Sequence, residues 1–140
     1  MYQKIVLVGN LGTDPEMRYM PNGTAVTNFN VATNRKWTDR ASGEQREETT
    51  WFRVSVWGQQ AEAANQYLSK GRQVLVEGRL RPDPQTGGPK LWSGQDGTMR
   101  ASFELTAETV RFIGGREGAA IMDGDSMEGP AAQEEDEIPF

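Results

Sequence analysis

Apolar residues in the first 113 positions recur mainly with the two-residue period of β-strands. Residues 5–8 form a continuous apolar run that Gly9 ends, as expected for a buried strand. Four later segments alternate apolar and polar side chains, namely residues 24–33, 51–57, 74–80 and 99–113. In the last two, the apolar face is predicted to hold Val74, Val76, Leu80, Ala101, Phe103, Leu105 and Ala107.

One segment between these strands has helical spacing instead. Ala61, Ala64 and Leu68 recur at helical intervals, which predicts a helix over residues 59–69. Lys70-Gly71 follows and is interpreted as a cationic last turn with a glycine C-cap.

Polar segments rich in turn residues separate the strands. Residues 21–23 read Pro-Asn-Gly and predict a tight turn, and residues 38–48 and 82–98 predict two exposed hairpin loops. Five strands with one helix between the third and the fourth have the chain order of the OB-fold, a small and partly open all-β barrel. Residues 1–113 are therefore predicted to form one OB-fold domain.

The remaining residues have a different composition. Residues 114–133 are mostly glycine, alanine and acids, which predicts a flexible linker without packed structure. The last seven residues place four acids before two large apolar groups, in the order Glu134, Glu135, Asp136, Glu137, Ile138, Pro139 and Phe140. A disordered tail has no packing reason to end on Ile and Phe, so we treat residues 134–140 as an acidic tip that is distinct from the linker.

The net charge of −5 conceals an asymmetry between these two parts. Residues 1–113 hold 14 Lys or Arg against 12 Asp or Glu, which gives a net charge of +2. Residues 114–140 hold only Arg116 against eight acids, which gives −7. A mildly basic body with an acidic end indicates two separate tasks, one of which suits an anionic partner.

The composition narrows the possible chemistry. The chain has no cysteine and no histidine, which excludes thiolate nucleophiles, histidine bases and Cys/His zinc sites. Residues 134–137 lack the rigid spacing of a metal site, and we expect no cofactor, no metal and no enzymatic activity. Because no apolar run exceeds four residues, no membrane span is expected, and the protein is expected in the cytoplasm.

The strand at residues 51–57 carries the strongest functional signal. Phe52, Val54 and Val56 share one face, and Trp51, Arg53, Ser55 and Trp57 share the other. Two tryptophans that flank an arginine suit stacked bases and a phosphate backbone. A subunit interface, or packing under the helix, would also explain these tryptophans.

Two further tryptophans stand among cations. Trp37 lies between Arg35, Lys36 and Arg40, and Trp92 follows Lys90. Base stacking needs aromatic rings, and phosphates need cations beside them, so all four tryptophans are candidate stacking residues. An ordinary solvated loop with one sheltered ring is the alternative for Trp37.

Several strings of residues resemble the bacterial single-stranded DNA-binding proteins. They are residues 5–12 (IVLVGNLG), 14–19 (DPEMRY), 21–23 (PNG), 51–54 (WFRV), 67–71 (YLSKG), 76–80 (VEGRL) and 138–140 (IPF). The resemblance implies an OB-fold, a homotetramer, and coating of single-stranded DNA in replication, recombination and repair, with association with the nucleoid when the protein is bound to DNA. It also implies that the tip docks into basic and apolar pockets of replication, recombination and repair proteins, with Phe140 giving both a ring and the terminal carboxylate.

The resemblance also implies roles for particular residues. Base stacking would fall to Trp37, Trp51, Trp57 and Trp92. Backbone contacts would fall to Lys4, Arg18, Arg53, Lys70, Arg72, Arg79 and Arg81, beside the cations Arg35, Lys36 and Arg40 near Trp37. The approach to Trp92, residues 81–92, is longer and less basic than is usual in the family.

Two other functions fit part of this pattern. An OB-fold adaptor or replication-restart subunit would use the aromatic face for a protein contact. An OB-fold that binds single-stranded RNA would use the same stacking.

Overall fold

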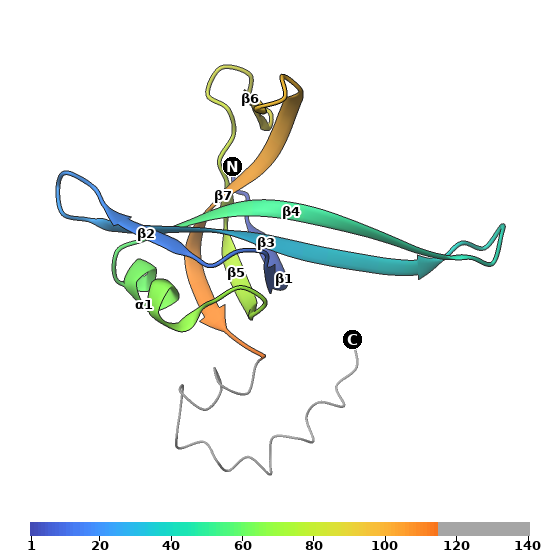
Figure 1. Cartoon of the computed structure of the whole chain (residues 1–140), viewed down its shortest axis with the longest axis horizontal. Helices are drawn as coiled ribbons and strands as arrows, with labels where there is room; N and C mark the ends of the chain where they lie inside the picture. Colours follow the sequence, from blue (N-terminus) through green and yellow to red (C-terminus); the bar gives the residue numbers. More distant parts are fainter. Residues whose placement is uncertain (115–140) are drawn as a thin grey trace, which may run out of the picture.

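The computed structural model describes residues 1–114, which form seven strands and one helix (Figure 1). The strands are β1 (Ile5–Leu11), β2 (Glu16–Tyr19), β3 (Ala25–Thr38), β4 (Gln45–Trp57), β5 (Gln73–Leu80), β6 (Lys90–Ser93) and β7 (Met99–Phe112). The helix α1 (Gln59–Tyr67) lies between β4 and β5 in the chain. The predicted tip at 134–140, and the predicted linker from residue 115 onward, lie outside the described residues.

Five of the strands close into a barrel in the order β1, β5, β7, β4, β3. The closing pair is β1 with β3, which are joined antiparallel at Asn10 with Ala32 and at Leu11 with Val31. β4 and β7 run parallel, and the other barrel pairs are antiparallel. A closed five-stranded barrel with its helix between the third and fourth barrel strands is the OB-fold, so this prediction is confirmed.

Small branched side chains fill the barrel interior. Val31, Val54, Val56, Val74 and Val76 are fully buried there. α1 packs against this core through the buried residues Ala61 and Ala64, and the Thr27 hydroxyl donates to the Ala61 carbonyl at 2.7 Å. The alternation seen in the sequence therefore identifies the central core correctly.

The end of the helix differs from the prediction. α1 ends at Tyr67, because Leu68 has an extended backbone and its side chain is buried in the core. Gly71 lies in a separate turn, where its N–H donates to the Leu11 carbonyl at 2.9 Å. The interpretation of Lys70-Gly71 as the helix C-cap was therefore wrong; the glycine connects this turn to β1.

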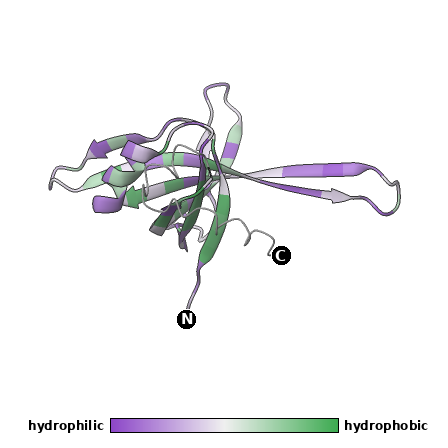
Figure 2. Ribbon diagram, turned by 90° about the horizontal axis from the view of Figure 1, so that it is seen from below, coloured by the Kyte–Doolittle hydropathy of each residue, from purple (hydrophilic) through white to green (hydrophobic). Residues whose placement is uncertain are grey.

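β3 and β4 extend past the barrel as a two-stranded arm, which comprises residues 33–50 (Figure 1). The predicted loop at 38–48 was too long, because β3 continues to Thr38 and β4 starts at Gln45. The arm is mainly hydrophilic (Figure 2). Pairs of opposite charge stabilise it across the strands, including Arg35 with Glu48 at 2.9 Å.

A second hairpin projects from another part of the barrel (Figure 1). β6 pairs antiparallel with the first residues of β7, so the predicted loop at 82–98 contains a strand. In β7 only Leu105 and Ala107 are buried, whereas Ala101 and Phe103 are exposed, and Leu80 in β5 is exposed as well. The apolar residues of β7 alternate as predicted, but not all of them are buried, because this end of β7 passes beyond the core, where Ala101 pairs with Leu91 of β6 and Phe103 with Phe52 of β4.

Within residues 1–114, no helix combines the length and the apolar character needed to cross a bilayer.

Candidate nucleic-acid interface

One outer face of the barrel carries polar and charged side chains in rows across the strands. Asn30 of β3 pairs in register with Arg53 of β4, and Arg53 pairs with Glu104 of β7. Side chains in register on neighbouring strands project from the same face, so these three groups form one row. Arg81 extends the row, because its backbone N–H donates to the Glu104 carbonyl at 2.7 Å.

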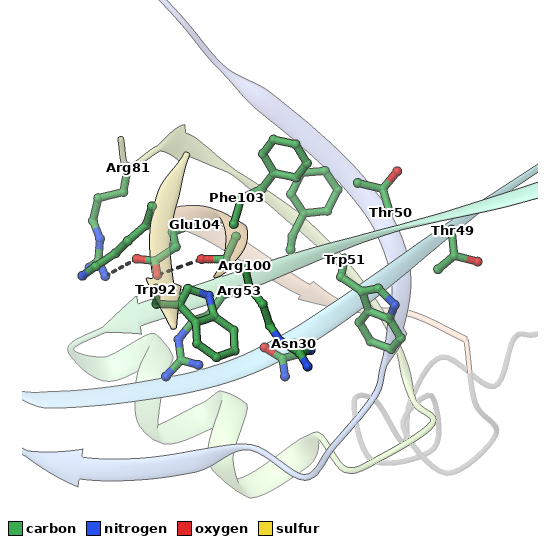
Figure 3. Close-up of a pocket in the computed structure, with 14 residues that line it drawn as sticks. Asn30, Thr49, Thr50, Trp51, Arg53, Arg81, Trp92, Arg100, Phe103 and Glu104 are labelled. Atoms are coloured by element: carbon green, nitrogen blue, oxygen red, sulfur yellow. Dashed lines mark hydrogen bonds and ion pairs between the residues drawn. The ribbon is translucent and has the colours of Figure 1, made fainter. Parts of the chain in front are cut away.

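A groove of about 990 Å³ lies over this face (Figure 3). Trp51 and Trp92, which are 52% and 46% exposed, lie on either side of Arg53 and Asn30. The cations that line the groove are Arg53, Arg81, Lys90 and Arg100. Exposed indoles with cations between them can stack planar bases while they neutralise a phosphate backbone.

Gly12, just after β1, determines where the Trp51 ring can lie. A Cβ at position 12 would lie 2.5 Å from Cζ3 of Trp51, closer than any real contact of this kind. The Gly12 N–H donates to the Asn30 carbonyl at 3.0 Å, which fixes this backbone beside the groove. Because Gly12 has no side chain, there is room beside it for the indole of Trp51.

Trp92 lies on β6 rather than in the predicted loop, and Arg100 of β7 holds its ring. The two residues pair in register, and Cζ of Arg100 lies 5.8 Å from the centre of the ring. Asp96 pairs with Arg100 at 3.5 Å. Hydrogen bonds from Thr98, and one from Arg100, lower the pKa of the Asp96 carboxyl, so this carboxylate stays charged and helps to place Arg100.

The other two tryptophans lie outside the groove. Trp57 is on the same face of β4 as Trp51, in the row of Val26 and Arg18, and it extends the polar face toward β2. Trp37 is on the arm, where alternation along β3 places it on the opposite face from the Asn30 row. The guanidinium of Arg35 lies 4.4 Å from the centre of the Trp37 ring.

Several predicted phosphate contacts are ion-paired within the protein. Lys4 pairs with Glu77 at 3.2 Å, Arg35 with Glu48 at 2.9 Å, Arg79 with Glu108 at 3.3 Å and Arg81 with Glu104 at 3.0 Å. The hydrogen bond and charge of Glu77 raise the pKa of the Lys4 ammonium. The carboxylate beside each of these cations offsets part of its attraction for a phosphate.

The remaining predicted cations are distributed over the surface. Lys36 and Arg40 are on the arm or its turn, and Arg18 is on β2. Lys70 and Arg72 lie in the turn after the helix, where the Lys70 N–H donates to Asp14 and the Arg72 carbonyl accepts from Leu11. Of the ten predicted cations, the groove brings together Arg53 and Arg81.

Sequence reasoning missed several residues that line the groove, namely Asn30, Lys90, Arg100, Phe103 and Glu104. Asn30 stands between Phe29 and Val31 in the alternating segment at residues 24–33, but only the strand register shows that it neighbours Arg53. Glu104 accepts hydrogen bonds from Arg81 at 3.0 Å and from Ser102 at 3.3 Å (Figure 3). Within residues 1–114, no three His, Cys, Asp or Glu side chains gather to hold a metal ion.

The topology and the groove define an OB-fold protein of the class that binds oligonucleotides or oligosaccharides across the face of its barrel. Residues 2–113 match the single-strand binding protein family, and the chain belongs to this family. The resemblance seen in the sequence motifs is thereby confirmed.

A solved structure with the same fold supports this assignment. It is described as a Plasmodium falciparum SSB in complex with ssDNA, and it is 28% identical in sequence. The match covers 81% of this chain and 97% of the other, with a TM-score of 0.65.

Proposed function

We propose that this protein binds single-stranded DNA without sequence preference. The observation that carries the proposal is the groove in which Trp51 and Trp92 lie on either side of Arg53. Membership of the single-strand binding protein family supports it, as does the likeness to a structure described as a complex with ssDNA. The protein acts by binding and not by catalysis.

Stacking supplies the sequence-independent part of this binding. Bases stack on Trp51 and Trp92 in the groove, and Trp57 offers a further ring on the same face of β4. Each stacked base contributes about 1–3 kcal/mol whatever its identity. Arg53 and Lys90 lie in the groove where the phosphates of such a strand would pass.

Tryptophan fluorescence tests the proposal directly. The protein is titrated with oligo(dT), and in parallel with oligo(U), at several salt concentrations. Strong quenching by oligo(dT) that saturates at a fixed number of nucleotides per chain supports the proposal. Stronger quenching by oligo(U) would assign the groove to RNA, and no quenching at low salt would assign the aromatic face to a protein partner.

The double variant Trp51→Ala with Trp57→Ala tests the stacking role of β4. Loss of two stacked bases is expected to weaken binding by about 2–6 kcal/mol if the two contributions add. Leu91→Ala serves as a control, because Leu91 is exposed on β6 and does not line the groove. Unchanged affinity in the double variant would make the tryptophan face a protein interface.

We further propose that the protein coats DNA during replication, recombination and repair, and that residues 134–140 recruit partner proteins. Support comes from the sequence, in which four acids precede Ile138 and Phe140. Deletion of residues 134–140 should abolish partner capture and raise DNA affinity at low salt, because an acidic tip competes with DNA for cations. A variant with only the four acids neutralised separates charge from the apolar end.

Self-association into a homotetramer is a further part of the proposal. Residues 5–10 of β1 pair with β5, whereas only Asn10 and Leu11 of this strand pair with β3 on its other side. Val6 and Val8 are 58% and 44% exposed, and a second copy of this chain would cover them. Light scattering should give four chains for the wild type and fewer for a Val6→Lys, Val8→Lys variant; a monomeric wild type would contradict the proposal.

We also propose a cytoplasmic protein that associates with the nucleoid. A fluorescent fusion should follow the DNA in cells, and the double variant Trp51→Ala with Trp57→Ala should spread through the cytoplasm. A wild-type fusion that avoids the DNA would contradict this location.

A further inference from the structure

A small apolar pocket adjoins the groove where the chain leaves β5. It has a volume of about 180 Å³ and is lined by Leu80, Pro82, Pro89 and the ring of Phe103, with Arg81 and Glu104 beside them. Phe103 is 48% exposed although it follows the apolar alternation of β7. A large exposed ring that is not part of the core is a candidate for binding.

The pocket is formed by a loop with its own hydrogen bonds. The Asp83 N–H donates to the Gly88 carbonyl at 2.9 Å, and the Gly87 N–H donates to the Asp83 carbonyl at 2.8 Å. The Asp83 carboxylate also accepts from the Gln85 N–H at 2.8 Å. These bonds hold the two prolines in place, so a ligand would meet a largely formed site.

The Phe103 ring is supported from behind. It contacts Phe52, with ring centres 6.0 Å apart and planes tilted by 38°. Phe52 packs against the core, so the exposed ring rests on a fixed partner. Such a ring loses little conformational freedom when a planar group stacks on it.

The pocket and the groove share a wall. Phe103, Arg81 and Glu104 line both cavities. A strand bound between Trp51 and Trp92 therefore passes the mouth of the pocket. The Arg81–Glu104 pair at that mouth offers donors and acceptors to the edge of a base, while Leu80, Pro82, Pro89 and Phe103 offer apolar surface.

We propose that this pocket accepts one nucleobase of the bound strand, stacked against Phe103. The inference rests on the proposed binding of single-stranded DNA and adds a stacking position that lies outside the four tryptophans. A base is favoured over an apolar side chain of a partner protein, because the pocket is continuous with the groove and has a polar pair at its mouth. This base turns out of the groove between Trp51 and Trp92 and enters the pocket beside residues 80–89.

Two variants and a control test this site by oligo(dT) titration. Phe103→Ala is expected to weaken binding about tenfold, with an unchanged salt dependence because the ring carries no charge. Gly88→Leu keeps Phe103 but adds a large side chain to a residue that lines the pocket, where a Cβ meets only the Thr86 hydroxyl at 3.7 Å. It should show the same loss, whereas Leu91→Ala, in neither cavity, should bind like the wild type.

Photocrosslinking locates the base without any change to the protein. Oligo(dT) with a single 5-iodouracil is irradiated on the wild type, and the crosslinked residue is identified by mass spectrometry. A crosslink at Phe103 supports the site. Crosslinks at Trp51 or Trp92 without one at Phe103, together with wild-type affinity for Gly88→Leu, would overturn it and leave the binding of DNA itself intact.

Discussion

The indole of Trp51 occupies space that a side chain at position 12 would take. Gly12→Ala should therefore displace this ring from the groove, even though alanine carries no charge. We expect weaker binding of oligo(dT), by up to the value of one stacked base, about 1–3 kcal/mol. Fluorescence titration measures this loss, and the Trp51 emission should change in the free protein as well.

A double-mutant cycle shows whether the loss arises through Trp51. In the Trp51→Ala background, Gly12→Ala should cost little more, because the displaced ring is already absent. An equal cost in both backgrounds would mean that Gly12 acts on the backbone of the β1–β3 junction instead.

Glu104 places a negative charge in the groove that we propose to bind the phosphates of single-stranded DNA. Its side chain is only 11% exposed and is held by Arg81 and Ser102. Glu104→Gln keeps the shape of the side chain but frees Arg81 for a phosphate. We expect tighter binding at low salt and a salt dependence steeper by about 0.7, the value for one added phosphate contact on a single strand.

Arg79 and Glu108 offer a matched comparison. They form a similar ion pair at 3.3 Å, but they do not line the groove. Glu108→Gln should leave DNA binding unchanged. Weaker binding of Glu104→Gln would show that the carboxylate positions Arg81 productively rather than competing with the phosphates.

The arm is an element that the barrel does not need for its stability. None of residues 33–50 belongs to the buried core, and exposed ion pairs such as those across the arm contribute about 0–1 kcal/mol each. Replacing residues 36–47 by Asn-Gly joins the paired residues Arg35 and Glu48 through a two-residue turn. We expect the free energy of unfolding to change by less than about 1 kcal/mol.

Urea unfolding followed by circular dichroism measures this change. Leu105→Ala, in the buried core, is the comparison and should cost about 2–5 kcal/mol. A comparable cost for the shortened arm would mean that the arm supports the barrel after all.

The elements that could be predicted are those whose pattern reports burial. Phe29 and Val31 are buried inside the barrel and alternate with asparagines along β3, and this strand was predicted. The arm was missed because cross-strand charge pairs, such as Arg35 with Glu48, sustain a ladder without any apolar pattern. β6 and β2 were missed because each has four residues, too few for a period to be recognised.

The site was partly predictable for the same reason. Trp51 and Arg53 share a face by simple alternation, which the sequence shows directly. That Trp92, Lys90 and Arg100 face them depends on the pairing of β6 with β7. Long-range register of this kind leaves no local signal in the chain.

For the molecule as a whole, fewer of the described cations are available to contact phosphates than their number suggests. Of the four that line the groove, Arg81 pairs with Glu104 and Arg100 with Asp96. Two to four phosphate contacts per chain predict a slope of log affinity against log salt of about −1.4 to −2.8. Titration across a salt series measures this slope, and a much steeper value would show that cations outside the groove also contact DNA.

The parallel pairing of β4 with β7 has a consequence for the order of events during synthesis. Arg53 and Glu104 are neighbours in the barrel but 51 positions apart in the chain. The long β3–β4 hairpin can form early from residues that are close in the sequence, whereas the row of Arg53 and Glu104 under the groove forms only after β7 has been synthesised. A nascent chain that still lacks β7 therefore carries Trp51 on its β3–β4 hairpin but has no groove. It can hold single-stranded DNA in the groove only after β7, the last strand of the barrel, has been synthesised.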